Sequence, residues 1–184
     1  MVEGTGFENR HWGNSIVSSN LTASAEYIRF DIIKIMSTTS FLLINLAISF
    51  YNVGTIWANE VDVFRSWKLI SPNDFLRVQK VHWKKLLYWV IIPWSLEIIG
   101  STLLIWYHPA GSPTWAIYGA TLCLWLSLIL TLFMWGPWQG KLSRDPLGSE
   151  SPYLAKILRT HWIRVILVNL YALILLTWVL ILIR

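Results

Sequence analysis

The 184-residue chain contains one cysteine, Cys123, which lies inside a long apolar stretch. A single thiol excludes a disulfide within the chain and a metal centre built from several thiolates. Charged residues are also scarce, at 14%, whereas an ordinary soluble domain carries roughly 25%. The chain has no phosphate-binding loop, no nucleotide-binding motif and no recognisable nucleophile signature. These absences argue against the common classes of soluble enzyme.

Hydrophobic residues make up 55% of the chain, and they gather in windows of the length that crosses a bilayer, about 20 residues. Thirteen tryptophans and seven tyrosines fall mostly near the ends of these windows, as is typical of membrane interfaces. The pattern predicts an all-α integral membrane protein, a four-helix bundle. The expected membrane helices are 38–59, 85–107, 114–137 and 161–183.

An internal repeat divides the chain into two similar halves. SPNDFLRVQKVHWKKLL begins at Ser71, SPYLAKILRTHWIRVIL begins at Ser151, and one gap aligns their His-Trp pairs at His82 and His161. An apolar run precedes and follows each copy, which predicts two repeated helical hairpins. In the first loop we expect a short interfacial helix, broken at Ser71, before the second membrane helix.

Basic residues concentrate in two of the three predicted loops, 58–84 and 138–160, and the tight second loop has none. The positive-inside rule therefore places these two loops in the cytoplasm and both termini outside the inner or plasma membrane. Because the net charge of +5 arises beside membrane spans, it does not indicate nucleic acid as a partner. Residues 1–35 are expected to form a poorly ordered polar extension, with 36–184 as a single transmembrane domain.

Asparagines recur every seven residues along the first predicted helix, at Asn45, Asn52 and Asn59. Heptad spacing keeps them on nearly one helix face, and an amide in hydrocarbon is costly unless it is hydrogen-bonded. The face should therefore point into the bundle. Two interpretations fit, because the amides can hold helices together or form the wall of a polar cavity.

Glu97 lies in the middle of the second predicted helix, with no basic residue at similar depth. An intramembrane acid favours a functional role such as proton relay, but a neutral carboxyl hydrogen-bonded to Asn45 or to a backbone carbonyl fits equally well. Depth estimates at ~1.5 Å per residue give two polar layers, Glu97 with Asn45 and Asn52 with Asn169.

The same estimates gather five polar residues at the cytoplasmic end of the bundle, and this group is the best candidate site. Two imidazoles and a carboxylate could bind a metal or haem, or move protons to a ligand. Alternatively, two histidines at matched helix positions only anchor their helices at the membrane interface. The cofactor is therefore either absent, or a metal or haem held by His82 and His161. Members of the group are Asn59, Glu60, His82, His161 and Arg164. The candidate catalytic residues are His82, His161, Glu60 and Glu97, and those that would bind a cofactor or ligand are Arg164, Asn59, Asn52 and Asn169.

Several short motifs from about residue 40 onward are shared with a known family. A Gly and an aromatic residue end the first helix (Gly54, Trp57), GPWQGKL ends the third, and HWIRV begins the fourth. On these motifs the chain resembles a family of small four-helix membrane proteins that includes the anthrone oxygenases. The resemblance implies the same fold and, in its oxygenase members, oxidation of polycyclic aromatic anthrones by molecular oxygen. The family's turn carries an Asn-rich motif around the proline, whereas this chain reads Gly-Pro-Trp-Gln from Gly136.

Two functions remain open at this point, and they leave undecided whether the chain is an enzyme. One is an oxygenase-like oxidoreductase acting on a hydrophobic aromatic or quinone-type substrate, in which His82, His161 and Glu60 act as bases or ligands. The other is a non-catalytic accessory subunit of a larger membrane complex, contacting lipids, pigments or other subunits. The expected partners are lipids, a hydrophobic small molecule, and a second copy or other membrane subunits. A transporter would need a dimer to form a path.

Overall fold

A computed structural model describes residues 37–184, and every regular element in this part of the chain is a helix. The predicted extension at 1–35 lies outside the described residues. Four helical spans are long and apolar enough to cross a membrane, which confirms the predicted all-α four-helix membrane bundle. They are span 1, Ser37–Leu69; span 2, Pro72–Leu103; span 3, Thr114–Leu142; and span 4, Pro152–Leu182.

Only span 4 is a single α-helix, α7 (Pro152–Leu182). In the other three spans, a five-residue π-helical turn interrupts the α-helix. Span 1 is α-helical over 37–58 and then contains η1 (Asn59–Val63), α2 (Phe64–Ser66) and η2 (Trp67–Leu69). Span 2 contains α3 (Pro72–Leu86), η3 (Leu87–Ile91) and α4 (Ile92–Leu103), and span 3 contains α5 (Thr114–Leu130), η4 (Thr131–Trp135) and α6 (Gly136–Leu142). The short 3₁₀ turn η5 (Gly148–Glu150) precedes span 4.

The two Ser-Pro pairs of the repeat begin spans 2 and 4. Ser71 Oγ accepts a hydrogen bond from the backbone N–H of Asp74 at 3.3 Å, and Ser151 Oγ accepts one from that of Tyr153 at 3.2 Å. A serine cap followed by proline in the first turn is a strong helix start. The predicted starts at residues 85 and 161 are therefore too late, since the helices begin at Pro72 and Pro152.

The segment expected to lie on the membrane surface forms α3, the first part of span 2, and continues directly into η3. The physical reason is the absence of a helix breaker between Pro72 and Pro93, so that nothing ends the helix near His82. Span 1 extends to Leu69 for the same reason. Only residues 70–71 and 143–151 separate spans at this end of the bundle.

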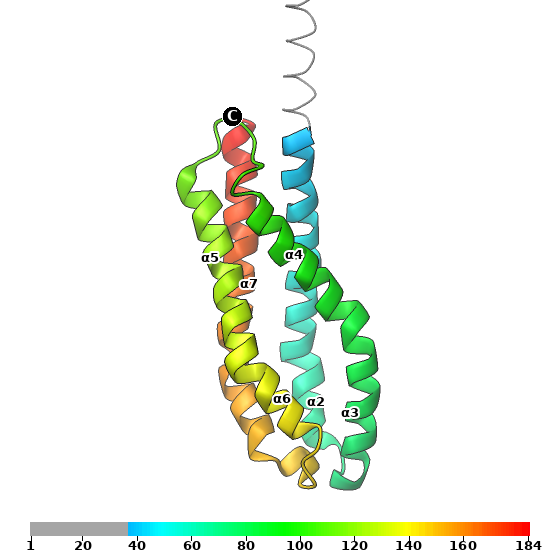
Figure 1. Cartoon of the computed structure of the whole chain (residues 1–184). Coiled ribbons are helices and arrows are strands. Elements are labelled where there is room, and N and C mark those ends of the chain that lie inside the picture. The colour runs from blue at the N-terminus through cyan, green and yellow to red at the C-terminus, as the bar shows by residue number, and fades with distance from the viewer. Residues whose placement is uncertain (1–36) are drawn as a thin grey trace, which may run out of the picture.

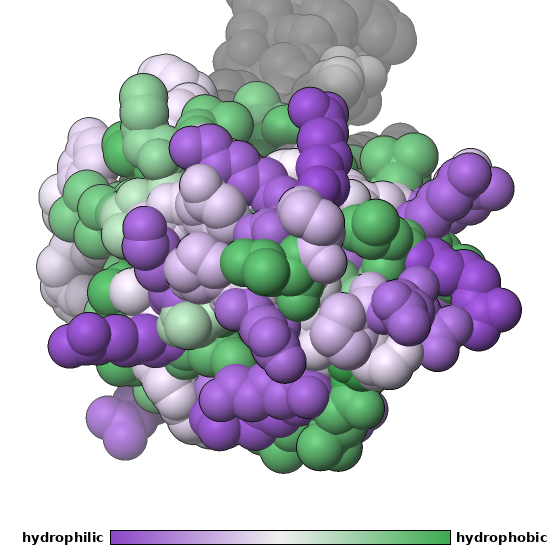
Figure 2. All heavy atoms as spheres, turned by 90° about the horizontal axis from the view of Figure 1, so that it is seen from below, coloured by the Kyte–Doolittle hydropathy of each residue, from purple (hydrophilic) through white to green (hydrophobic). Residues whose placement is uncertain are grey.

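We call this end, which carries the 70–71 and 143–151 connections, the basic end. Viewed from there, hydrophilic side chains surround and alternate with apolar ones (Figure 2). All four spans and the 143–151 connection contribute exposed basic side chains to this end: Arg65, Lys68, Arg77, Lys80, Lys141, Arg144, Lys156 and Arg159.

The spans differ in how deeply they are packed. α5 and α7 lie side by side, and a third of the most apolar window of spans 3 and 4 is buried (Figure 1). In span 2 the corresponding fraction is 17%. Spans 3 and 4 thus form a packed pair, and span 2 is the loosest wall of the bundle.

Candidate functional site

The three π-helical turns converge on one cavity inside the bundle. Asn59 of η1, Ile91 of η3 and Thr131 of η4 all line it. π-helical turns are rare and occur frequently at functional sites, because the extra residue per turn redirects side chains and frees backbone groups. Three of them around one space identify this region as the candidate site.

Proline explains two of these turns. Pro93 and Pro137 each stand two residues after the last residue of a π turn, and proline lacks the N–H that would continue the α-helical pattern. The carbonyl of Trp89, four residues before Pro93, instead accepts a hydrogen bond from the Tyr51 hydroxyl at 3.1 Å. At the second turn, a Cβ on Gly136 would lie 2.8 Å from the carbonyl oxygen of Thr131, so the turn requires glycine there.

The cavity has a volume of about 60 Å³. A buried water needs roughly 10–15 Å³ on the same measure, so there is room for several small groups. Polar side chains from spans 1, 3 and 4 form one part of the wall: Asn52, Thr55, Asn59, Thr131, Gln139 and Arg164. Apolar side chains form the rest, mostly from spans 1 and 2: Ile56, Phe64, Leu86, Val90, Ile91, Trp94 and Val168.

Span 2 separates the cavity from the outside of the bundle by a thin apolar wall. Ile91 lines the cavity and is 36% exposed, and its neighbours Tyr88 and Trp89 are 68% and 64% exposed. At this depth an exposed apolar side chain faces lipid. The cavity therefore has a polar interior and borders the lipid phase on its apolar side.

Arg164 brings a positive charge into the polar part of the wall. Its Nη2 donates to Thr131 Oγ1 at 3.0 Å, and its Cζ lies 4.3 Å from the ring centroid of Trp135. Its Nε is buried and has no hydrogen-bond partner among the described residues. The ion pairs found in residues 37–184 do not include Arg164.

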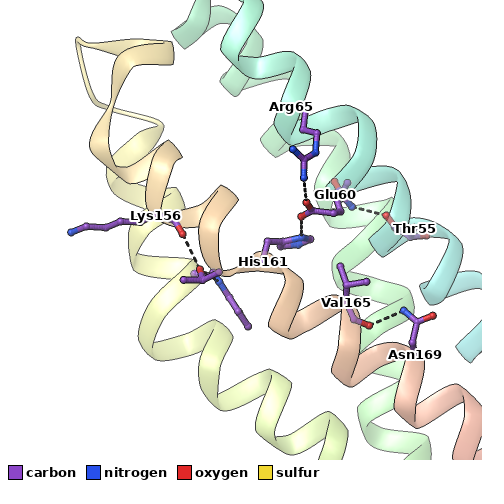
Figure 3. Close-up of polar contacts among 10 residues, drawn as sticks. Thr55, Glu60, Arg65, Lys156, His161, Val165 and Asn169 are labelled. Atoms are coloured by element: carbon purple, nitrogen blue, oxygen red, sulfur yellow. Dashed lines mark hydrogen bonds and ion pairs between the residues drawn. The ribbon is translucent and has the colours of Figure 1, made fainter.

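A buried acid–imidazole pair lies beside the cavity. Glu60, in the π turn η1, accepts a hydrogen bond from His161 Nδ1 at 2.9 Å and one from Arg65 Nη2 at 2.8 Å (Figure 3). Glu60 and His161 are almost completely buried, whereas Arg65 reaches the surface. With its Nδ1 proton directed at the carboxylate, His161 presents the lone pair of Nε2, which is buried and unpartnered among the described residues. This is the geometry of an oriented proton acceptor.

Phe64 connects this pair to the cavity. Its ring lines the cavity, and its centroid lies 4.6 Å from that of the His161 ring in an edge-to-face contact. The imidazole itself does not line the cavity. Proton exchange between a bound molecule and His161 would therefore pass beside Phe64.

His82 lies apart from the Glu60–His161 pair. It is half-buried, and its ring contacts Trp67 edge-to-face at 4.9 Å, while Trp67 contacts Phe64 at 5.0 Å. Two aromatic rings thus connect the two histidines. In the part of the chain that the structure describes, no group of three or more His, Cys, Asp or Glu side chains could hold a metal ion. The predicted metal or haem role of His82 and His161 gains no support from this arrangement.

Glu97 is buried farther from the basic end and hydrogen-bonds to a different asparagine from the one predicted. Its Oε2 accepts from Asn52 Nδ2 at 2.7 Å, and no described cation pairs with it. The predicted pairing with Asn45 is wrong, because the oblique course of α4 and the π turn shift the register between spans 1 and 2. Asn45 instead donates to the Phe41 carbonyl and packs against Gly100, where a Cβ would lie 2.0 Å from Asn45 Oδ1.

The predicted layer of Asn52 with Asn169 is also wrong. Asn169 donates to the Val165 carbonyl at 2.7 Å and accepts from Trp57 Nε1 at 3.3 Å, at a half-buried contact between spans 1 and 4. It does not line the cavity. Asn52 and Asn59 do line it, so both interpretations of the asparagine face apply: Asn52 bridges two helices and also forms cavity wall.

Sequence reasoning missed several residues of the site, chiefly Thr131, Gln139, Phe64 and Trp94. The prolines Pro93 and Pro137 inside apolar runs are the sequence signal that could have located two of the three π turns. Comparisons with protein-family models, with curated proteins and with solved structures found no match for this chain. The resemblance to the anthrone oxygenase family therefore stays a prediction.

Proposed function

We propose that this polytopic membrane protein takes the oxygen-bearing end of a hydrophobic aromatic or quinone-type molecule from the lipid phase into the central cavity and acts on it as an oxidoreductase. The convergence of three π turns on one cavity with a polar interior and an apolar, lipid-facing wall carries the proposal. Such a shape suits a flat molecule with one or two oxygen atoms. Gln139 and the second amide N–H of Asn59 would donate to these oxygens, and Trp94 would contact the ring face.

The Glu60–His161 pair gives the site a chemical role. Oxidation of a phenol, a quinol or an activated ring C–H requires loss of a proton, and general-base catalysis accelerates such a transfer typically by 10²–10⁴-fold. For His161 to act as this base, the Phe64 ring has to move aside and open its Nε2 to the cavity. The oxidant implied by the resemblance is molecular oxygen. No step is assigned to a metal.

Ligand-induced stabilisation tests the binding part of this proposal. A molecule that binds only the folded protein stabilises it by about 2.7 kcal/mol at a hundredfold excess over Kd. We expect a short-chain quinone to raise the melting temperature of the purified protein. Val90→Phe, which fills the cavity, should abolish this shift, whereas Leu87→Phe on the lipid-facing side of the same helix should keep it. Equal shifts in both variants would contradict the cavity as the binding site.

An accessory role in a larger complex is the second candidate, and the loose packing of span 2 favours it. Tyr88 and Trp89 project from the span with the smallest buried fraction, which is a surface that another membrane subunit could cover. Replacing both with leucine keeps the face compatible with lipid but removes its aromatic shape. An accessory subunit would then shift to a smaller assembly on a native gel, whereas an enzyme that acts alone would migrate unchanged.

The proposed orientation places the basic end in the cytoplasm, because the exposed basic side chains of all four spans gather there. Cysteines introduced at the exposed positions Asn73 and Ala110 lie at opposite ends of the bundle. An impermeant thiol reagent added to intact cells should label Ala110→Cys and spare Asn73→Cys. The reverse pattern would invert the topology.

A further inference from the structure

Arg164 is a cation at bilayer depth that the described residues leave without a counter-ion. It lies 12 residues after the start of α7, or about 18 Å along the helix axis at ~1.5 Å per residue. Ionisable side chains at such positions are costly and pair with other groups or with a substrate. A guanidinium that lines a cavity and has no carboxylate partner therefore indicates an anionic ligand.

The two buried carboxylates of the described residues do not fill this role. Both oxygens of Glu60 are already engaged, by His161 and by Arg65. Glu97 does not line the cavity, and its hydrogen bond is to the amide of Asn52. The remaining polar wall consists of neutral amides and hydroxyls, so the positive charge of Arg164 stands alone in the cavity.

The guanidinium is also held in a fixed plane. Stacking on Trp135 positions one of its faces, and the bond from Nη2 to Thr131 fixes its rotation. Of its five N–H donors, the one on the buried Nε has no partner among the described residues. A planar group with fixed orientation and free donors is suited to a carboxylate or another anionic oxygen.

We propose that the cavity binds the anionic head group of an amphipathic molecule, with Arg164 as its counter-ion and the apolar body directed past Leu86, Val90 and Ile91 toward lipid. This inference rests on the proposed function for the cavity itself and adds the charge of the ligand. A volume of about 60 Å³ matches a head group of a few heavy atoms, such as a carboxylate or an ionised phenol, and leaves the rest of the molecule outside.

A matched acid and ester test the inference. The probes are an anthracene-tagged fatty acid and its methyl ester, and binding is measured in phosphatidylcholine nanodiscs by energy transfer from the protein's tryptophans. Charge-assisted hydrogen bonds predict that the acid binds about tenfold to hundredfold tighter than the ester. Arg164→Gln should remove the preference. Arg159→Gln, an exposed arginine on the same helix, should retain it.

Arg164→Lys provides a second variant in case glutamine impairs folding. It keeps the charge but loses the planar fork, so the preference for the acid should persist at reduced size. Equal binding of acid and ester to the unaltered protein, or a preference that survives Arg164→Gln, would overturn the anionic ligand. If both probes bind equally and Val90→Phe blocks both, the proposed cavity function stands and only the charge assignment fails. If neither probe binds, the anionic ligand is overturned, and the quinone-induced rise in melting temperature decides the cavity function separately.

Two sources could supply such an anion, a membrane phospholipid or a free amphipathic acid. Nanodiscs that contain phosphatidylglycerol distinguish them. Loss of acid binding in these discs would identify the phospholipid headgroup as the occupant, and unchanged binding would identify a free acid. Either result keeps Arg164 as the anion-binding residue.

Discussion

The two copies of the internal repeat begin alike and end with different tasks. Both start a spanning helix with a capping serine and a proline, and both place a histidine about ten residues later. In the second copy, His161 is buried and hydrogen-bonded to Glu60, on a helix that runs unbroken for 31 residues. In the first copy, His82 is half-buried against Trp67, on a helix interrupted by a π turn and Pro93.

This difference shows how one motif can serve two purposes. The second copy supplies the fixed side of the site, His161 and Arg164 on a straight, well-packed helix. The first half of the chain supplies the acid Glu60 from the end of span 1, before the first copy, and the thin apolar wall from span 2. Repetition therefore provides the scaffold, and divergence within it provides the site.

The largest expected effect separates the two histidines. His161→Gln keeps a hydrogen-bonding side chain but removes the titratable imidazole, so turnover of a quinol or anthrone should fall by roughly 10²–10⁴-fold while the protein remains folded. His82→Gln should have a much smaller effect, because no acid among residues 37–184 forms an ion pair with that ring. Steady-state rates of the two purified variants provide the measurement. Equal losses of turnover would contradict this distinction and indicate that both histidines take part in the reaction.

The next largest effect concerns Glu60, the acid that is hydrogen-bonded to His161 of the second copy. Glu60→Leu leaves the buried Nδ1–H of His161 without its acceptor, and losing a hydrogen bond to a charged carboxylate costs about 1.5–3 kcal/mol. Asp62→Leu, an exposed acid in the same π turn, is the control and should change stability little. Denaturant titration in mixed micelles would measure both, and a similar stability for the two variants would mean that the pair does not hold spans 1 and 4 together.

A smaller effect is expected at Glu97, the buried acid of the first copy's helix. Glu97→Gln keeps the hydrogen bond with Asn52 and should preserve stability, whereas Glu97→Leu leaves the amide unsatisfied at about 1–3 kcal/mol. Thermal unfolding of the two variants compares them. A glutamine variant that folds normally but has no activity would assign proton relay to Glu97, and full activity would exclude it.

The smallest effect compares the two serine caps. Replacing a capping serine with alanine typically costs about 1 kcal/mol. Ser151 is buried and also donates to Asp145 at 2.6 Å, whereas Ser71 is exposed. Ser151→Ala should therefore lower the melting temperature more than Ser71→Ala. The opposite order would indicate that span 2, despite its loose packing, limits stability.

The sequence was sufficient to predict the fold because hydropathy alone defines four apolar segments of spanning length. Helix boundaries were harder, because the amphipathic stretch after Ser71 has the composition of a surface helix but contains nothing that would end a helix before Pro93. Such a segment continues a span whenever neighbouring helices cover part of it.

The site was partly foreseeable. Depth along the helices was enough to place Glu60 and His161 in one group, since each lies at the basic end of its span. Partners such as Asn45 and Asn169 could not be assigned in this way, because π turns and helix tilt move the register by a turn or more. The cavity depends on the same π turns. The π turn that begins at Asn59 contains no proline or glycine, so the sequence gives no signal for it.

The central claim is that a hydrophobic molecule occupies the cavity between the π turns. Photolabelling tests this claim most directly. An azido-quinone would be photolysed with the protein in nanodiscs, and the adducts mapped by mass spectrometry with and without excess unlabelled quinone. The account predicts competable adducts on the cavity-lining residues from Asn52 to Phe64 and from Leu86 to Trp94. Labelling confined to α5, or labelling that excess quinone does not suppress, would contradict it.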